Sequence, residues 1–231
     1  MSISGKDLSA LPRSVVEEMV RKAVYSRAPR TAVAGGCSQQ SANPLVVNVS
    51  ARHCHLTAEA VEQLFGQGKS LTPMKYLYQE GQYAAKEAVT LIGPRSRVIS
   101  NLRILGPCRT LNQVELSYTD AVSLGYDIPL RSSGDIAGST GCMLMGPAGY
   151  FEMNEGVIRA KRHVHMHPDD AARYGVEAGD YMKLRIGGEC GAVLENMLVR
   201  VDPSFKLEVH IDTDEGNACG LRPDSFCELI K

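Results

Sequence analysis

Residues 52–55 read Arg-His-Cys-His, and residues 162–165 read Arg-His-Val-His, 110 residues further along the chain. Side chains of an extended strand point alternately to its two faces, so the two histidines of each motif share one face. Neutral imidazole is a common zinc ligand, and a metal needs donors that converge in this way. The motif therefore predicts two strands that each present a pair of metal ligands, with Cys54 on the opposite, buried face.

The residues that follow each pair repeat as well. Thr57 and His167 are each placed to cap a short helix, and Pro168 suits the first turn of the second helix. A glycine follows where each helix can end. We therefore expect a duplicated unit made of a strand with His-x-His and a short helix.

A second internal alignment gives each half a third ligand. With residues 101–103 placed over residues 196–198, an offset of 95, Glu115 falls on His210. Each is the polar member of an alternating strand pattern and a residue type that binds zinc. Three protein ligands with an open fourth position are typical of catalytic zinc, whereas structural sites usually have four. The predicted ligand sets are His53, His55 and Glu115 in the first half, and His163, His165 and His210 in the second.

Composition argues against several classes of function. A chain of 231 residues can bury a substantial core, as one large domain or two small ones. Its formal net charge of −1 gives no electrostatic case for binding nucleic acid or an anionic membrane. No apolar run approaches the ~20 residues that span a bilayer, and no signal peptide is expected. Seven cysteines without CxxC spacing indicate a reducing compartment and argue against a zinc ribbon.

Residues 1–27 are predicted to form a separate amphipathic helical segment. Apolar side chains recur at i, i+3 and i+4 spacing from Leu8 to Val24, with charged residues opposite. Residues 28–44 are rich in Pro, Ala, Gly, Ser and Gln without periodicity, which is typical of a flexible linker. The pattern alone leaves two possibilities open: the helix docks on another molecule, or it packs on the core.

From residue 45 onward, short β-rich runs alternate with glycine-rich turns and short helices. Strands do not alternate with long helices, so a Rossmann-type sheet is not expected. The predicted fold is mainly β with short α caps, arranged as two small β-barrels or sandwiches. The predicted repeats are residues 45–127 and residues 128–231.

Five stretches carry a resemblance to a known family. They are VSARHCHLT at 49–57, QYAAKE at 82–87, LGPCR at 105–109, PLRSSGD at 129–135 and AKRHVHM at 160–166. Together they resemble the PduL-type phosphotransacylases, the phosphate propanoyltransferases of bacterial microcompartments. The resemblance extends from about residue 45 to the C-terminus and includes both His-x-His motifs.

The resemblance implies a duplicated β-barrel domain that interconverts acyl-CoA plus phosphate with acyl phosphate plus free CoA. It also implies two zinc ions close together between the halves, one held by each ligand set, and a phosphate bound by Arg109. The residues implied in CoA binding are Val49, Ser50, Ala51, Arg103 and Asn217, to which Lys75 is added as a cation for the CoA phosphates.

The resemblance further implies that residues 1–27 act as an encapsulation peptide, which would bind a shell protein and bring the enzyme into a microcompartment lumen. A homodimer is expected because dimers are the commonest closed assembly. Two other classes remain open: a zinc-dependent hydrolase, and a non-catalytic metal-binding module. The acyl preference cannot be read from the sequence, because propanoyl and acetyl groups differ by one methylene, worth about 1–3 kcal/mol in a pocket.

Overall fold

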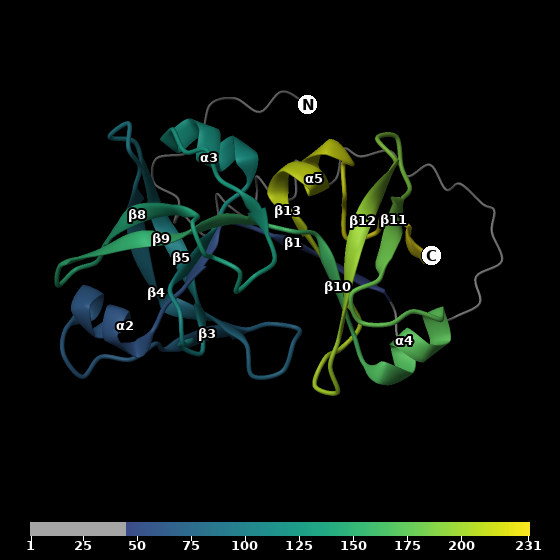
Figure 1. Ribbon diagram of the computed structural model, residues 1–231, viewed down its shortest axis with the longest axis horizontal. Helices are drawn as coiled ribbons and strands as arrows, with labels where there is room; N and C mark the ends of the chain where they lie inside the picture. The colour runs from purple at the N-terminus through teal and green to yellow at the C-terminus, as the bar shows by residue number, and fades with distance from the viewer. Residues whose placement is uncertain (1–44) are drawn as a thin grey trace, which may run out of the picture. The chain divides into compact units, whose positions relative to one another are not determined.

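A computed structural model describes residues 45–231, in which the strands of two β-sheets alternate with short helices (Figure 1). The predicted mainly β fold with short helical caps is therefore confirmed. The helix predicted in residues 1–27 and the linker predicted at 28–44 lie outside the described residues. None of the helices in residues 45–231 has the length and apolar character needed to cross a membrane.

The first sheet contains a closed ring of strands. In order it contains β3 (Pro73–Tyr76), β4 (Tyr83–Ile92), β5 (Val98–Gly106), β2 (His53–His55), β6 (Gln113–Glu115), β9 (Tyr150–Ala160) and β7 (Leu130–Arg131). β8 (Thr140–Met145) pairs with β4 on one side and with β9 on the other. The ladders β4-β5-β2-β6-β9-β8 therefore return to β4 and make a six-stranded barrel, the kind of closed sheet that was predicted.

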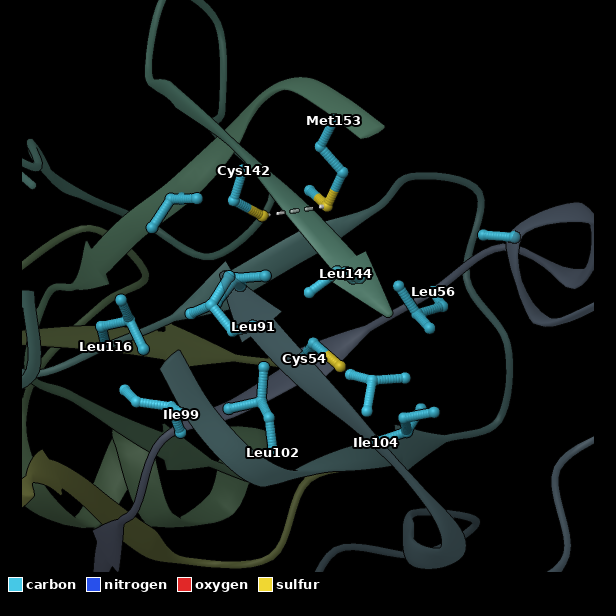
Figure 2. Packing of buried hydrophobic residues seen from close by; sticks show 14 of the residues in the cluster. Cys54, Leu56, Leu91, Ile99, Leu102, Ile104, Leu116, Cys142, Leu144 and Met153 are labelled. Carbon is cyan, nitrogen blue, oxygen red and sulfur yellow. Dashed lines mark hydrogen bonds between the residues drawn. The ribbon is translucent and has the colours of Figure 1, made fainter. Parts of the chain in front are cut away.

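Apolar side chains fill this ring, as Figure 2 shows. Leu91, Leu102 and Leu144 come from three different strands and are at most 1% exposed. Cys54 is fully buried among them, which confirms its predicted place on the face of β2 away from the histidines. The interior of the barrel is thus a packed core, and the polar side chains of β2 face out of it.

The second sheet is open. It contains β1 (Val46–Ser50), β13 (Glu208–Asp212), β10 (His163–Met166), β12 (Ala192–Val201), β11 (Tyr181–Ile186) and β14 (Cys227–Ile230), in that order. Closure would need a strand that pairs on both sides, as β8 does, and within residues 45–231 no strand joins β14 to β1. The expectation of two closed barrels is corrected: the second sheet is a half-barrel over its own core, which includes Val164, Met182 and Val209.

Each sheet contains strands from both halves of the sequence. β1 comes before the first His-x-His motif, yet it pairs with β13 in parallel, with Val47 opposite Val209. β7, β8 and β9 follow residue 127 but pair within the first sheet. Because each sheet contains strands from both sequence halves, neither sheet consists of one contiguous segment. The domain limits at 45–127 and 128–231 stay a prediction.

Two backbone positions that are 95 residues apart, the offset of the second internal alignment, have the same unusual conformation. Asn101 in β5 and Asn196 in β12 both have a φ of 58°, in the left-handed region that asparagine tolerates better than most residues. Each lies at a register shift in its hairpin, between Leu102 and Ile99 in β5 and between Met197 and Leu194 in β12. The two hairpins therefore share a β-bulge at equivalent positions.

The two helices predicted after the His-x-His motifs begin and end as their sequences indicate. Residues 45–231 contain four helices, α2 (Ala58–Phe65), α3 (Tyr118–Leu124), α4 (Pro168–Tyr174) and α5 (Thr213–Ala218). Thr57 caps α2, and its side chain accepts a hydrogen bond from the main-chain N–H of Ala60. His167 caps α4, ahead of the proline at its first position. Gly66 and Gly175 follow the last turns of α2 and α4.

Polar contacts join the two sheets beside α3 and α5, which Figure 1 shows near one another. The main-chain N–H of Thr119 in α3 donates to Asp214 in α5, over 2.9 Å. Arg159 at the end of β9 donates to Asp212 at 2.5 Å and to Glu215 at 2.8 Å. These contacts fix the barrel against the half-barrel, and the functional residues lie near this junction.

Candidate functional site

The first predicted ligand set is assembled by two neighbouring strands of the barrel. His53 and His55 lie on one face of β2, and His53 is opposite Glu115 of the antiparallel strand β6. The ligand atoms of the three side chains all lie within 4.8 Å of one another. Nε2 of His53 is 3.6 Å from Oε2 of Glu115. The arrangement provides two imidazoles and a carboxylate in one place, a donor set that suits zinc.

The second predicted ligand set has the same construction in the half-barrel. His163 and His165 lie on one face of β10, and His163 is opposite His210 of the antiparallel strand β13. Their ligand atoms also lie within 4.8 Å of one another. The rings of His163 and His210 are stacked with centroids 4.7 Å apart, and the ring of His165 stacks on Phe205 at 4.1 Å. The structure thus brings all six predicted ligands into two clusters of three.

Main-chain carbonyls orient the first imidazole of each motif. Nδ1 of His53 is 2.8 Å from the carbonyl oxygen of Ala51, and Nδ1 of His163 is 2.9 Å from that of Lys161. A carbonyl oxygen can only accept, so Nδ1 carries the proton and Nε2 keeps its lone pair. A metal-binding histidine usually donates its other ring N–H in this way. Nε2 of both rings is therefore free to bind a metal.

Both ring nitrogens of His165 in the second cluster are buried and have no hydrogen-bond partner among the described residues. A buried polar atom without a partner costs free energy, so such atoms need an explanation. A divalent metal bound by this cluster would supply the missing partner. The residues present thus fit the metal implied by the resemblance.

Burial sets the protonation states that a metal requires. Burial, reinforced by neighbouring cations and imidazoles, lowers the pKa of His55 to about 3, of His163 to about 4 and of His165 to about 2. Burial alone would raise the pKa of Glu115, but His53 and His55 beside it lower the pKa below its ordinary value. These three imidazoles are therefore neutral and the Glu115 carboxylate is ionised near neutral pH, which are their metal-binding forms.

Arg109 lies within electrostatic range of both clusters. Its charge contributes to the lowered pKa of His55 in the first cluster and of His165 in the second. Its main-chain N–H donates to the carbonyl oxygen of Leu56 over 2.9 Å, which ties its loop to the residue after the first motif. The structure therefore brings the predicted phosphate ligand together with the predicted metal ligands.

Ser50, one of the predicted CoA residues, lines a pocket together with residues of both clusters. A small pocket between the sheets is lined by Ser50 together with Glu115, His163 and His210, and by Leu116, Ala160, Lys161, Ile211 and Asp212. Ser50 follows Val49, whose side chain packs against α5, and precedes Ala51, whose carbonyl orients the first histidine. The stretch 49–51 thus passes beside this pocket, and its role toward CoA stays a prediction.

The other predicted CoA residues do not line this pocket. Nη1 of Arg103 donates to the carbonyl oxygens of Ala85 and Lys86, over 2.8 and 3.0 Å. Lys75 lies on β3, a strand exposed along its whole length. Asn217 is exposed in α5. Their roles toward CoA stay predictions, and Arg103 would have to release two carbonyls to reach a ligand.

Comparison with known proteins agrees with this geometry. A family model described as phosphate propanoyltransferase matches residues 46–222. The chain belongs to the phosphate propanoyltransferase family. The predicted resemblance is confirmed, and so is the prediction that the protein is an acyltransferase enzyme.

Relatives from distant bacteria align over most of the chain. It is 55% identical over 226 residues to a phosphate propanoyltransferase of Planctopirus limnophila, which covers 96% of this chain and 92% of the relative. It is 47% identical over 188 residues to the phosphate propanoyltransferase of Thermotoga maritima, an alignment that covers 81% of this chain and 89% of the relative. It is 45% identical over 189 residues to that of Salmonella typhimurium, which again covers 81% of this chain and 89% of the relative.

Sequence reasoning missed three polar residues near the two clusters. Arg200 in β12 is opposite His165 and lowers its pKa by its charge. Gln113 and Glu208 are buried, at 0% and 2% exposure, on the strands that carry the third ligands. The offset of 95 places Gln113 over Glu208, so the internal repeat could have singled out this pair.

Proposed function

We propose that the protein interconverts propanoyl-CoA plus phosphate with propanoyl phosphate plus CoA. The observation that carries the proposal is the convergence of Arg109 with two clusters of imidazole and carboxylate ligands in a chain of this family. A transfer between a thioester and phosphate needs an anion site beside groups that accept developing negative charge. The two clusters and Arg109 meet both needs.

The proposal includes two bound divalent metals. Zinc is the metal that the imidazole and carboxylate donors favour. His53, His55 and Glu115 would hold one, and His163, His165 and His210 the other. When bound, the metals would supply Lewis acidity toward the thioester carbonyl and the phosphate oxygens. The support is the unpartnered buried nitrogens of His165 and the free Nε2 atoms of the first imidazole in each motif.

Arg109 would orient the attacking phosphate. Phosphate is already an anion at neutral pH, so it needs orientation more than deprotonation, and no general base is assigned. The guanidinium fork matches two phosphate oxygens. One phosphate oxygen would bond to the thioester carbonyl carbon as the carbon–sulfur bond breaks. The electron pair of that bond leaves with sulfur, and the CoA thiolate then takes up a proton.

Ser50 would line the approach of the CoA thioester. Its place beside Glu115, His163 and His210 in one pocket supports this role. The adenosine and phosphate part of CoA would extend outward along residues 49–51. Lys75, Arg103 and Asn217 are proposed to meet it there. Acetyl-CoA is proposed as a second substrate, because one methylene changes binding by only about 1–3 kcal/mol.

The proposed setting is the lumen of a bacterial microcompartment. Residues 1–27 would bind a shell protein through their apolar stripe, and the enzyme would assemble as a homodimer. The support is the amphipathic spacing from Leu8 to Val24 and the linker composition of residues 28–44.

The decisive experiment measures thiol release from propanoyl-CoA with and without phosphate. The proposed transferase releases CoA only with phosphate present and forms an equal amount of propanoyl phosphate, which hydroxylamine traps as the hydroxamate. Thiol release at the same rate without phosphate would instead identify a hydrolase. No release under either condition, from protein that contains its metals, would identify a non-catalytic metal-binding module.

A further inference from the structure

Each ligand cluster has a fourth polar side chain on the same strand face. Gln113 lies two residues before Glu115 in β6, and Glu208 lies two residues before His210 in β13. Alternation along a strand places each pair on one face. Gln113 is opposite His55 and Glu208 is opposite His165, so each half contains a square of four side chains from two paired strands.

Gln113 holds the carboxylate of the first cluster. Its Nε2 donates to Oε1 of Glu115 over 2.7 Å and to the hydroxyl oxygen of Ser133 over 2.9 Å. Its Oε1 accepts from the main-chain N–H of Gly134 over 2.7 Å. Because a main-chain N–H can only donate, this last contact fixes which end of the amide faces Glu115. The fully buried amide is therefore locked with its donor toward the carboxylate.

Glu208 is surrounded by donors in the second cluster. Oε2 accepts from Nε2 of Gln79 over 2.6 Å, and Oε1 accepts from Nδ2 of Asn48 over 3.2 Å. The main-chain N–H of Lys206 donates to Oε1 of Gln79, which fixes the orientation of that amide. Nε2 of His210 lies 3.2 Å from Oε2 of Glu208. Both carboxylate oxygens are thus engaged by amides, and one of them also faces the imidazole.

The chemical type of the fourth side chain changes together with that of the third ligand: Gln113 accompanies Glu115, and Glu208 accompanies His210. Where the third ligand is a carboxylate, its partner is an amide donor; where the third ligand is an imidazole, its partner is a carboxylate. A carboxylate at position 113 would repel Glu115. An amide at position 208 that presented its N–H to His210 would place two donors against each other. The pairing is therefore chemically matched in each half.

We propose that Gln113 and Glu208 are positioning residues, which orient Glu115 and His210 for their metals. The inference rests on the proposed function, because it takes the ligand sets from there. Gln113 presents an N–H end, which binds no metal. Glu208 accepts amide donors at both oxygens, and its Oε2 lies beside the ring of His210. Partners of this kind typically change metal affinity by about 10–100-fold when they are replaced.

The test uses the full-length, zinc-loaded protein and the isosteric exchanges Gln113→Glu and Glu208→Gln. The rate at which a chromogenic chelator in excess removes zinc is measured. We expect both variants to retain two zinc ions per chain, with one of the two leaving about 10–100-fold faster than in the wild type. Glu195→Gln is the matched control, since Glu195 is exposed and paired with Lys183; its zinc release should equal the wild-type rate.

Two further measurements separate positioning from a purely structural role. In cobalt-substituted protein, the visible absorption bands report ligand geometry, and both exchanges should shift those of one site. Gln79→Ala removes a hydrogen-bond donor from Glu208 without replacing a buried residue. It should accelerate release of the same zinc as Glu208→Gln, by a smaller factor, and it keeps the test valid if Glu208→Gln folds poorly.

Wild-type release rates in Gln113→Glu and Glu208→Gln, with unchanged cobalt spectra, would overturn the proposal. Complete loss of one zinc from Glu208→Gln would overturn it in another way, by making Glu208 a direct ligand. Slower release from Gln113→Glu would refute the donor role of Gln113. Failure of the proposed function is separate: wild-type protein would then contain fewer than two zinc ions or release no thiol with phosphate.

Discussion

Nε2 of His53 lies 3.6 Å from Oε2 of Glu115, across the register of two antiparallel strands. The offset that places Glu115 over His210 recurs here as geometry, because His163 and His210 face one another in the same register. In each half, one local motif and one distant strand supply three convergent donors. The metal predictions depend on this relationship.

Metal content is the first prediction. We expect two zinc ions per chain in protein purified without chelators, because each cluster offers three ligand atoms within 4.8 Å. His53→Ala or His163→Ala should remove one zinc and lower phosphate-dependent thiol release by at least about 100-fold. Elemental analysis and the thiol assay measure these effects. Circular dichroism must accompany them, because a lost ligand can also weaken the fold. One zinc or none per wild-type chain would contradict the prediction.

Arg109→Lys should impair phosphate use selectively. Lysine keeps the positive charge but loses the two-pronged guanidinium. Hydrogen bonds to charged groups contribute about 1.5–3 kcal/mol, so the Michaelis constant for phosphate should rise about tenfold or more, with a lower turnover number. Acyl-CoA binding should change little. Initial-rate kinetics with each substrate varied in turn measure the effect, with the exposed Arg185→Lys as control. Wild-type phosphate kinetics in Arg109→Lys would remove Arg109 from the site.

Arg159→Ala should destabilise the junction between the sheets. The Arg159 side chain is 12% exposed and contacts Asp212 and Glu215, which are 11% and 8% exposed. Removing one partner of a buried ion pair typically costs about 3–5 kcal/mol, because charge is left buried and unpaired. We expect the free energy of unfolding to fall by about 3 kcal/mol in denaturant titration.

The control for that change is Arg185→Ala. Its partner Glu228 lies 3.4 Å away, and the two side chains are about half exposed. An exposed pair contributes less than about 1 kcal/mol. Equal effects of the two substitutions would mean that the buried network contributes no more than a surface pair.

Thiol reactivity should differ sharply among the cysteines of residues 45–231. Burial raises the pKa of Cys142 to about 12 and raises that of the fully buried Cys54 as well. A raised pKa lowers the fraction of reactive thiolate at pH 8, and burial also excludes the reagent. Cys190 is exposed and should be alkylated first by iodoacetamide in the native protein. Peptide mass mapping measures the order, and early labelling of Cys54 would contradict the buried core.

The last prediction concerns residues 1–27. Fused to a fluorescent reporter, they should form puncta only in cells that make a cognate microcompartment shell. Removal of these residues should leave catalysis intact, because no proposed ligand lies among them. Unfolding or loss of activity in the truncated enzyme would mean that the segment belongs to the core. A scrambled segment of equal composition is the matched control for the reporter.

Several features could be predicted because they depend on short stretches of chain. The two histidines of each motif share a face because side-chain direction alternates with every residue. Thr57 and His167 cap their helices because an N-cap bonds to a group two or three residues away. Glu115 and His210 were found by the internal repeat, which transfers a pattern from one half to the other.

Barrel closure could not be predicted in the same way. It depends on β8 pairing with β4 and β9 at once, and in the half-barrel no described strand does this. Ring closure is a long-range event that alternation within single strands does not encode. The exchange of β1 into the second sheet escaped prediction for the same reason, since its partner β13 lies about 160 residues further on.

The sequence by itself determined which side chains share a strand face, where the short helices start and stop, and which positions correspond in the two halves, because these follow from local geometry and internal repetition. Only the tertiary structure decided which strands pair and in what register. That register brings Gln113 opposite His55 and Glu208 opposite His165, and the fold brings Arg109 near both clusters. Such contacts arise from packing between distant segments, and one residue of slippage would turn each side chain to the opposite face.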